Sequence, residues 1–175
     1  MSSLELVLPH LPRLRRYARL LTGDAVRADD LLQDTLERAA RKWALWQPQA
    51  DRLGPGSALR GWLLSLMHNL YLNQRRDDRE ALHEQLDDEQ EPSHEPLMQL
   101  QQRLDLERAL AQLSAPAREV LLLVCVEEFS YDEAARILDV PVGTVMSRLS
   151  RARERLRRLV AGEAVMKDPP LRVVR

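Results

Sequence analysis

The stretch from Glu128 to Arg158, EFSYDEAARILDVPVGTVMSRLSRARERLRR, predicts two helices joined by a short turn. Ser130 is followed three residues later by Glu133, a capping-box spacing that predicts a first helix over residues 131–138. Residues 139–143, DVPVG, interrupt this helix, because proline cannot continue a helix interior and glycine allows backbone angles closed to other residues. A helix-turn-helix is the arrangement that this pattern favours.

The second helix is expected to begin near Thr144 and to bury one narrow stripe. Apolar residues recur along it at steps of four, three, four and three: Val145, Leu149, Ala152, Leu156 and Leu159. The rest of its surface carries six arginines against a single acid, Glu154. Solvated helix faces usually mix both signs of charge, so this face predicts contact with phosphate. An ordinary amphipathic helix with a solvated arginine face is the alternative.

Composition places the chain among small proteins with segregated charge. It has 175 residues and a formal net charge of −1, yet residues 79–107 hold nine acids and two bases. The single cysteine, Cys125, lies in the apolar run VLLLVCV at 120–126 and is predicted to be a small buried hydrophobe. A lone cysteine supports neither a disulfide framework nor a zinc site.

Several functional classes find little support. The four histidines (His10, His68, His83, His94) form no metal-ligand spacing. The chain also shows no phosphate-cradling glycine loop and no nucleophile with a matching base, so we expect neither an enzyme nor a cofactor. There is no signal-peptide pattern, and no apolar run approaches the roughly 20 residues that span a bilayer. We therefore expect a soluble cytoplasmic protein without membrane insertion.

Helical periodicity without strand signals predicts an all-α fold. A first helix is expected over Leu4 to Leu21, ended by Thr22 and Gly23. Asp24 is a plausible N-cap for a second helix that runs through Ala39 toward Trp46. On that helix Asp30, Asp34 and Glu37 fall at i, i+4 and i+7 and form an acidic ridge; a merely solvated face is the alternative interpretation.

The remaining segments complete two groups of helices. Residues 47–58 hold two prolines and two glycines and predict an exposed loop, and a third helix follows from Leu59 to about Arg76. Residues 77–96 are acidic and lack apolar periodicity, which is typical of a flexible linker. Two further helices, over 97–113 and 115–128, lead into the helix-turn-helix.

The chain resembles a group 4, extracytoplasmic-function (ECF) sigma factor of bacterial RNA polymerase. The most specific match is PVGTVMSRLSRARERL at 141–156, accompanied by Leu110–Leu113, Arg118 and Ser130–Ala135. The amino-terminal match rests on DDLLQDTLERA at 29–39 and GWLLSLMHNL at 61–70. The resemblance covers nearly the whole length. It implies a specificity subunit that binds core polymerase, with an anti-sigma factor as its usual regulator.

The resemblance also implies a domain architecture. Residues 4–78 would form the sigma-2 domain, 79–99 the flexible acidic linker and 100–160 the sigma-4 domain, followed by a tail at 161–175. Sigma-2 of this family binds the clamp helices of the polymerase β′ subunit, and sigma-4 meets the β flap. The residues that correspond to the clamp-binding surface are Asp30, Gln33, Asp34 and Glu37.

Two DNA-binding surfaces follow from the same resemblance. Minus-10 recognition and melting would fall on the 51–60 loop and the helix after it, with Asn69 holding a flipped base and Trp62 offering either a stacking surface or a core side chain. Arg60, Arg75 and Arg76 are candidate phosphate contacts. In the minus-35 helix, Thr144, Ser147, Arg148 and Arg151 would lie near base edges and Arg153 and Arg155 near phosphate.

Some positions depart from the family's pattern. Met146 stands where a lysine or arginine is frequent, and Ser150 stands where a larger side chain is common; both bear on promoter sequence. A second hypothesis retains DNA binding by the helix-turn-helix but involves no binding to RNA polymerase. It is a stand-alone transcriptional regulator whose amino-terminal part senses a ligand or dimerises.

Overall fold

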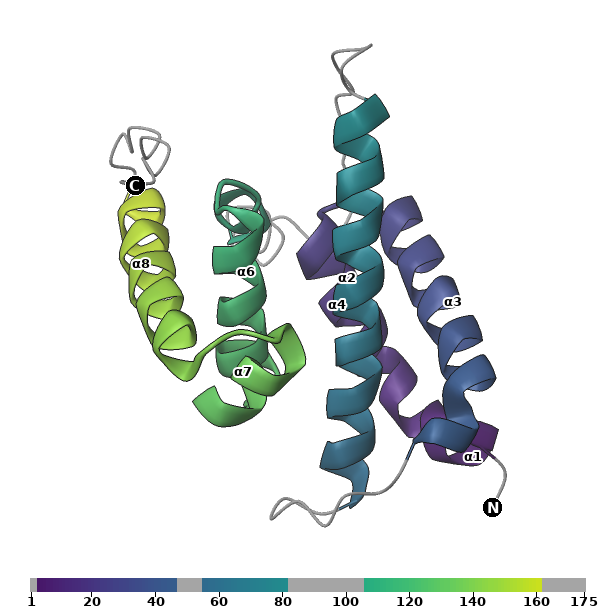
Figure 1. Cartoon of the computed structure of the whole chain (residues 1–175). Helices are drawn as coiled ribbons and strands as arrows, with labels where there is room; N and C mark the ends of the chain where they lie inside the picture. The colour runs from purple at the N-terminus through teal and green to yellow at the C-terminus, as the bar shows by residue number, and fades with distance from the viewer. Residues whose placement is uncertain (1–2, 47–54, 82–105, 162–175) are drawn as a thin grey trace.

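A computed structural model of the chain describes residues 3–46, 55–81 and 106–161. Within these residues every regular element is helical, which confirms the predicted all-α fold. The long helix α4, Pro55–Ala81, lies between two groups of helices (Figure 1). We call α1 to α4 the amino-terminal bundle and residues 106–161 the carboxy-terminal bundle. No helix of the described residues is long and apolar enough to cross a membrane.

The first predicted helix is divided into three pieces. The chain forms α1 over Ser3–Val7, a 3-10 turn over Leu8–His10 and α2 over Leu11–Thr22. The prolines at positions 9 and 12 each lie in the first turn of a new piece, because proline has no N–H to continue the preceding helix. Gly23 ends α2 with φ of 74°, as predicted.

The second helix confirms its predicted cap. α3 spans Ala25–Lys42, and the Asp24 carboxylate accepts a hydrogen bond of 2.7 Å from the Arg27 backbone N–H. A 3-10 turn, Trp43–Leu45, follows it. One face of α3 is buried against α2 and α4 and consists of Ala28, Leu31, Leu32, Thr35 and Ala39.

α4 is longer at both ends than the predicted helix. It begins at Pro55, inside the segment predicted to be a loop, where proline suits the first position of a helix. It ends at Ala81, five residues beyond the predicted end at Arg76 and inside the acidic segment predicted to be a linker. The other residues of that loop and of the linker lie outside the described part of the chain. With 27 residues the helix is about 40 Å long. It packs within the amino-terminal bundle against α3 and also contacts α7 of the carboxy-terminal bundle.

The carboxy-terminal bundle follows the predicted order. Residues 106–111 are helical, and α6 spans Ala115–Leu121. A π-helical segment, Leu122–Val126, continues α6, after which come α7 over Tyr131–Leu138 and α8 over Val142–Val160. The prediction that Cys125 is buried is wrong, because this helix is covered on only part of its circumference and Cys125 faces outward.

The two bundles share a continuous apolar core. α4 packs against α3 on one side and against α7 on the other, and α2 contacts α6. At the crossing of α4 and α7, a Cβ atom on Gly61 would lie 3.6 Å from Phe129, an ordinary van der Waals distance. The expected pair of helical domains is therefore present, and in this structure the two pack against each other.

Glu128 has a strained backbone conformation just before α7, and its substitution measures the cost of that strain. Its φ of 60° lies in the left-handed region, which glycine adopts at little cost and other residues do not. We expect Glu128→Gly to be about 1 kcal/mol more stable than Glu128→Ala, measured by urea unfolding. Both variants remove the same carboxylate, so equal free energies of unfolding would show that the backbone at this position is not strained.

Candidate nucleic-acid interface

The helix-turn-helix is built by contacts close in sequence. The Ser130 backbone N–H donates to the Glu133 carboxylate at 2.8 Å, and the Glu133 N–H donates to the Ser130 hydroxyl at 3.3 Å, which confirms the capping box. Asp139 ends α7 in the left-handed region, and the Thr144 N–H donates to the Pro141 carbonyl at 2.9 Å as α8 begins. α6 and α7 both pack against α8, and these two contacts fix the orientation of α8 within the carboxy-terminal bundle.

The surface of α8 divides its predicted DNA contacts into two sets. Ser147, Arg151 and Arg153 are exposed, whereas Thr144, Arg148 and Arg155 are half-buried. The Ser147 hydroxyl donates to the Thr144 carbonyl at 3.1 Å, and Arg151 Nε donates to the Ser147 carbonyl at 3.3 Å. The outward face of the first half of α8 therefore includes Ser147 and Arg151, with the smaller Gly143 and Ser150 and the exposed Met146 beside them.

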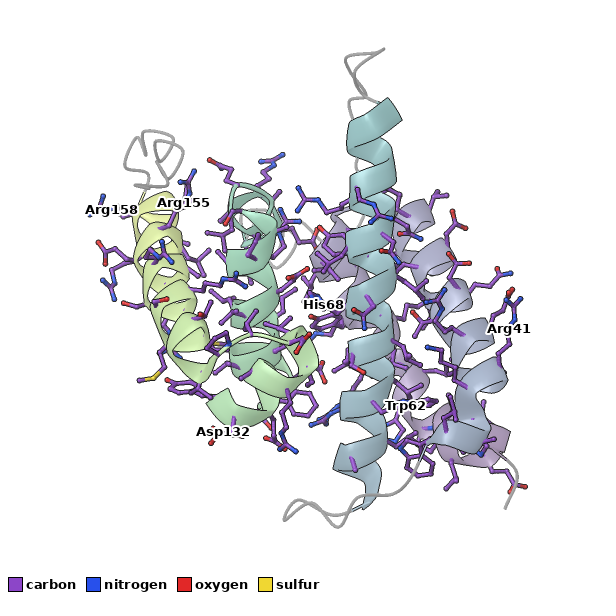
Figure 2. All side chains as sticks on the ribbon, viewed as in Figure 1. Arg41, Trp62, His68, Asp132, Arg155 and Arg158 are labelled. Atoms are coloured by element: carbon purple, nitrogen blue, oxygen red, sulfur yellow. The ribbon has the colours of Figure 1, made fainter. Side chains whose placement is uncertain are left out.

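The second half of α8 carries ion pairs. Glu154 accepts from Arg157 and from Arg158, the latter at 3.0 Å, and all three side chains are exposed. Arg155 and Arg158 lie toward the carboxyl end of the helix (Figure 2). Exposed pairs of this kind contribute little to stability, so phosphate could replace Glu154 as the partner of either arginine.

The five residues predicted for minus-10 contacts lie on two faces of α4. Trp62, Asn69 and Arg76 are spaced at i, i+7 and i+14 and share one face. Arg60 and Arg75 lie on the other side of the helix, where Arg75 is 5.8 Å from the centre of the Tyr71 ring. The structure therefore brings three of the five together and separates the other two from them.

Asn69 and Trp62 differ in how accessible they are. Asn69 is exposed, and its side-chain amide donates to the Ser65 carbonyl at 2.9 Å. Trp62 is half-buried and meets Trp43 edge-on at 6.0 Å between ring centres, with Trp46 at 6.3 Å. Trp62 thus belongs in part to an aromatic cluster and in part to the surface (Figure 2).

Arg60 faces the carboxy-terminal bundle. Its side chain is 15% exposed, its Nε is 3.6 Å from the Glu127 carboxylate, and its Nη2 donates to the Glu127 carbonyl at 3.1 Å. The guanidinium also lies 4.7 Å from the centre of the Phe129 ring. In this arrangement of the bundles, a residue predicted to contact phosphate is held between them.

Two further polar contacts join the bundles, and the sequence interpretation missed both. His68 Nδ1 lies 3.3 Å from the Glu119 carboxylate, with the side chains 7% and 3% exposed, and Figure 2 shows His68 between α4 and α6. Arg118 donates to the Leu21 carbonyl at the end of α2. One signal was available, because Glu119 interrupts the buried apolar face that α6 forms with Ala115 and Leu122.

The predicted acidic ridge is accessible. Asp30, Gln33, Asp34 and Glu37 are all exposed on α3. The Gln33 amide donates to Glu37 at 3.3 Å, and the Gln74 amide of α4 donates to Asp34 at 3.1 Å. The ridge therefore offers carboxylates to a partner beside the α3–α4 seam.

A groove with a largely apolar lining runs along α2 where it meets the carboxy-terminal bundle. Leucines of α2 and α3 line one wall, with three arginines among them. The other wall comes from residues 106–110, α6 and the π-helical segment. The lining residues that the two walls contribute are Leu11, Pro12, Arg15, Arg16, Arg19, Leu20, Leu32, Leu36, Leu106, Glu107, Leu110, Leu121, Leu122 and Val126.

Comparison with known proteins matches both bundles. Residues 103–156 match the family model described as Sigma-70, region 4, and residues 7–68 match that of the Sigma2 domain of PhyR. The chain is 38% identical over 161 residues to the ECF RNA polymerase sigma factor EcfG of Rhodopseudomonas palustris, covering 88% of this chain and 82% of EcfG. It is 31% identical to the phyllosphere-induced regulator PhyR of Methylorubrum extorquens, but spans only 55% of that longer protein.

Among solved structures, the fold is similar to that of the sigma factor RpoE in complex with the anti-sigma factor NepR from Bartonella quintana. The TM-score is 0.78 at 31% identity, and the match covers 90% of this chain and 95% of RpoE. The likeness extends over both bundles, so it includes the way in which they pack together.

Glu127 predicts a dependence of stability on pH. Burial raises the pKa of its carboxyl above the ordinary 4.5, although Arg60, Arg13 and Arg16 act to lower it. Its contribution to stability is therefore fully present below pH 4.5 and is lost as the pH rises through the raised pKa. Relative to Glu127→Gln, the unaltered chain should lose stability in urea unfolding as the pH rises above 4.5 and through the raised pKa of Glu127.

Glu128→Gln is the matched control, since it removes the neighbouring exposed carboxylate. It should leave most of the pH dependence in place, because repulsion by Glu128 is the last and smallest cause of the raised pKa of Glu127. If the free energies of unfolding of Glu127→Gln and of the unaltered chain changed equally with pH, burial would not raise the pKa of Glu127.

Proposed function

The chain belongs to the extracytoplasmic-function sigma factors of bacterial RNA polymerase, and we propose how its surfaces divide the work of promoter recognition. A sigma factor directs core polymerase to promoters. The observation that carries this proposal is the exposed, nearly one-signed face of α8 on a rigid helix-turn-helix. The chain acts as a non-catalytic, cytoplasmic specificity subunit. Family membership favours this role over the stand-alone regulator.

α8 enters the major groove of the minus-35 element. Its first half presents Ser147 and Arg151 to base edges, while Thr144 and Arg148 approach from the half-buried flank. Arg153 and Arg155 lie further along the helix and contact phosphate. Position along α8 supports this division, because the residues near the amino terminus of a recognition helix are the ones that contact base edges.

The minus-10 element meets the face of α4 that bears Trp62, Asn69 and Arg76. The exposed amide of Asn69 can donate and accept hydrogen bonds at the edge of a flipped base, and the exposed part of Trp62 adds apolar surface. Arg60 and Arg75 lie on the other side of α4, where Arg60 becomes accessible to phosphate only after the bundles separate, since it now contacts Glu127.

Core polymerase provides the force that separates the bundles. The exposed ridge of Asp30, Gln33, Asp34 and Glu37 binds the clamp helices of β′ through charge complementarity, and the carboxy-terminal bundle binds the β flap. Residues 4–78 and 100–160 then act as two domains, with 79–99 as their linker and 161–175 as a tail. Holding them at promoter spacing raises the effective concentration of the second DNA contact.

An anti-sigma factor of the NepR type is the proposed regulator. The support is the likeness to RpoE, which was solved in complex with NepR. The groove beside α2 suits such a partner, because its apolar lining would accept the apolar face of a helix and Arg15, Arg16 and Arg19 would pair with acidic residues along that helix. Occupying this groove would stabilise the packed arrangement of the bundles.

Run-off transcription with purified core polymerase on genomic fragments tests the main function. We expect initiation only when the chain is added. Arg151→Ala should cost about 1–3 kcal/mol at particular bases of the upstream element, because it removes a base-edge contact. Arg157→Ala is the control, and should weaken binding to all sequences alike.

The outcomes separate three roles. Promoter footprints from the chain alone, with no initiation by core, would support a stand-alone regulator. Binding of an anti-sigma factor without any initiation would indicate a mimic of a sigma factor. A uniform loss with Arg151→Ala would remove that residue from the base-reading set.

NepR of Bartonella quintana can serve as the probe for the groove. Arg19→Glu should weaken its binding to the chain about tenfold in calorimetric titration, because the substitution places a carboxylate where acidic residues are expected. Arg41→Glu is the matched control, because Arg41 is an exposed arginine in the last turn of α3 that does not line the groove (Figure 2). It should leave the affinity for NepR unchanged. Equal affinities for the two variants would place NepR elsewhere.

A further inference from the structure

Met146 is an exposed apolar side chain on the surface that faces DNA in the proposed function. It is 53% exposed, and on α8 the other large apolar side chain exposed to this degree is Val160, at the far end. Burial of methionine is normally favourable, so this exposure leaves apolar surface in water that a partner could cover. A single exposed apolar side chain is also common on protein surfaces. The position of Met146 on α8 therefore decides whether its exposure indicates a binding contact.

The neighbours of Met146 leave space around it. At 100° per residue, Gly143, Ser147 and Ser150 fall within one 100° arc that begins at Met146. All three are exposed and small. Val145 and Leu149, in contrast, are buried on the opposite flank. The methionine thus borders a shallow, uncrowded strip in the first half of α8.

The polar side chains beside this strip are tied to the helix. The Ser147 hydroxyl and Arg151 Nε both donate to carbonyls of the preceding turn. Met146 carries no such tether, and its unbranched thioether adapts its shape to a partner. Its exposed surface can therefore make an apolar contact without breaking a hydrogen bond.

We infer that Met146 is a specificity-determining residue that contacts the 5-methyl group of a thymine in the upstream promoter element. This inference rests on the proposed role of α8 in the major groove. The thymine methyl is the one apolar group that a base pair presents there, and it is absent from cytosine. The small Ser150, one turn further along α8, leaves room for the methyl to approach the thioether.

Uracil provides the test, because it differs from thymine only by the methyl group. Holoenzyme first selects duplexes from a library randomised in the upstream element. Each selected thymine, on either strand, is then replaced singly by deoxyuridine, and binding is measured. At one position we expect uracil to weaken the unaltered holoenzyme about fourfold, the effect of one buried methylene-sized group.

Met146→Ala should bind the thymine duplex about fourfold more weakly and should no longer distinguish thymine from uracil there. Met146→Leu should retain the distinction. Val160→Ala is the matched control, since it truncates an exposed apolar side chain of the same helix away from the strip. Urea unfolding of each variant shows whether the fold is intact.

Three results would overturn the assignment. One is the same thymine-to-uracil ratio at every position for the unaltered chain and Met146→Ala. Another is a selected upstream element that contains no thymine on either strand. The third is failure of holoenzyme to enrich any sequence, which refutes the proposed function together with this assignment, whereas the first two leave that function standing.

Discussion

The guanidinium of Arg118 is the contact on which the arrangement of the two bundles depends. Helices leave carbonyl groups without partners at their carboxyl ends, and Arg118 supplies donors to two such ends. It donates to the carbonyls of Leu110, Ala111 and Leu113 at and just beyond the end of the helix at 106–111, and to that of Leu21 at the end of α2. One planar side chain thus stabilises the start of the carboxy-terminal bundle and attaches it to the amino-terminal one.

The remaining polar contacts between the bundles suit an interface that opens. His68 with Glu119 and Arg60 with Glu127 are buried contacts between polar side chains, whose attraction is offset by the cost of removing such groups from water. Such pairs specify a register better than they add stability. Apolar side chains in place of these two pairs would hold the bundles more firmly and, in the proposed function, would make them harder for polymerase to separate.

The packed arrangement covers the two proposed DNA-binding surfaces to different extents. The outward face of α8 and the face of α4 with Asn69 remain at the surface, whereas Arg60 is enclosed by Glu127 and Phe129. The acidic ridge of α3 is also exposed. In the proposed function, polymerase would therefore begin to bind while Arg60 is still covered, and full promoter contact would then require the bundles to part.

The sequence by itself determined the elements whose signals are local. The capping box at Ser130 and Glu133, the DVPVG turn and the apolar stripe of α8 act over a few residues, so the helix-turn-helix and its exposed arginines were predictable. Tertiary structure alone decided the exposure of Cys125, the two faces of α4 and the enclosure of Arg60. Arg60 and Glu127 are 67 residues apart, and no spacing in the sequence reports such a contact, because packing of separate helices creates it.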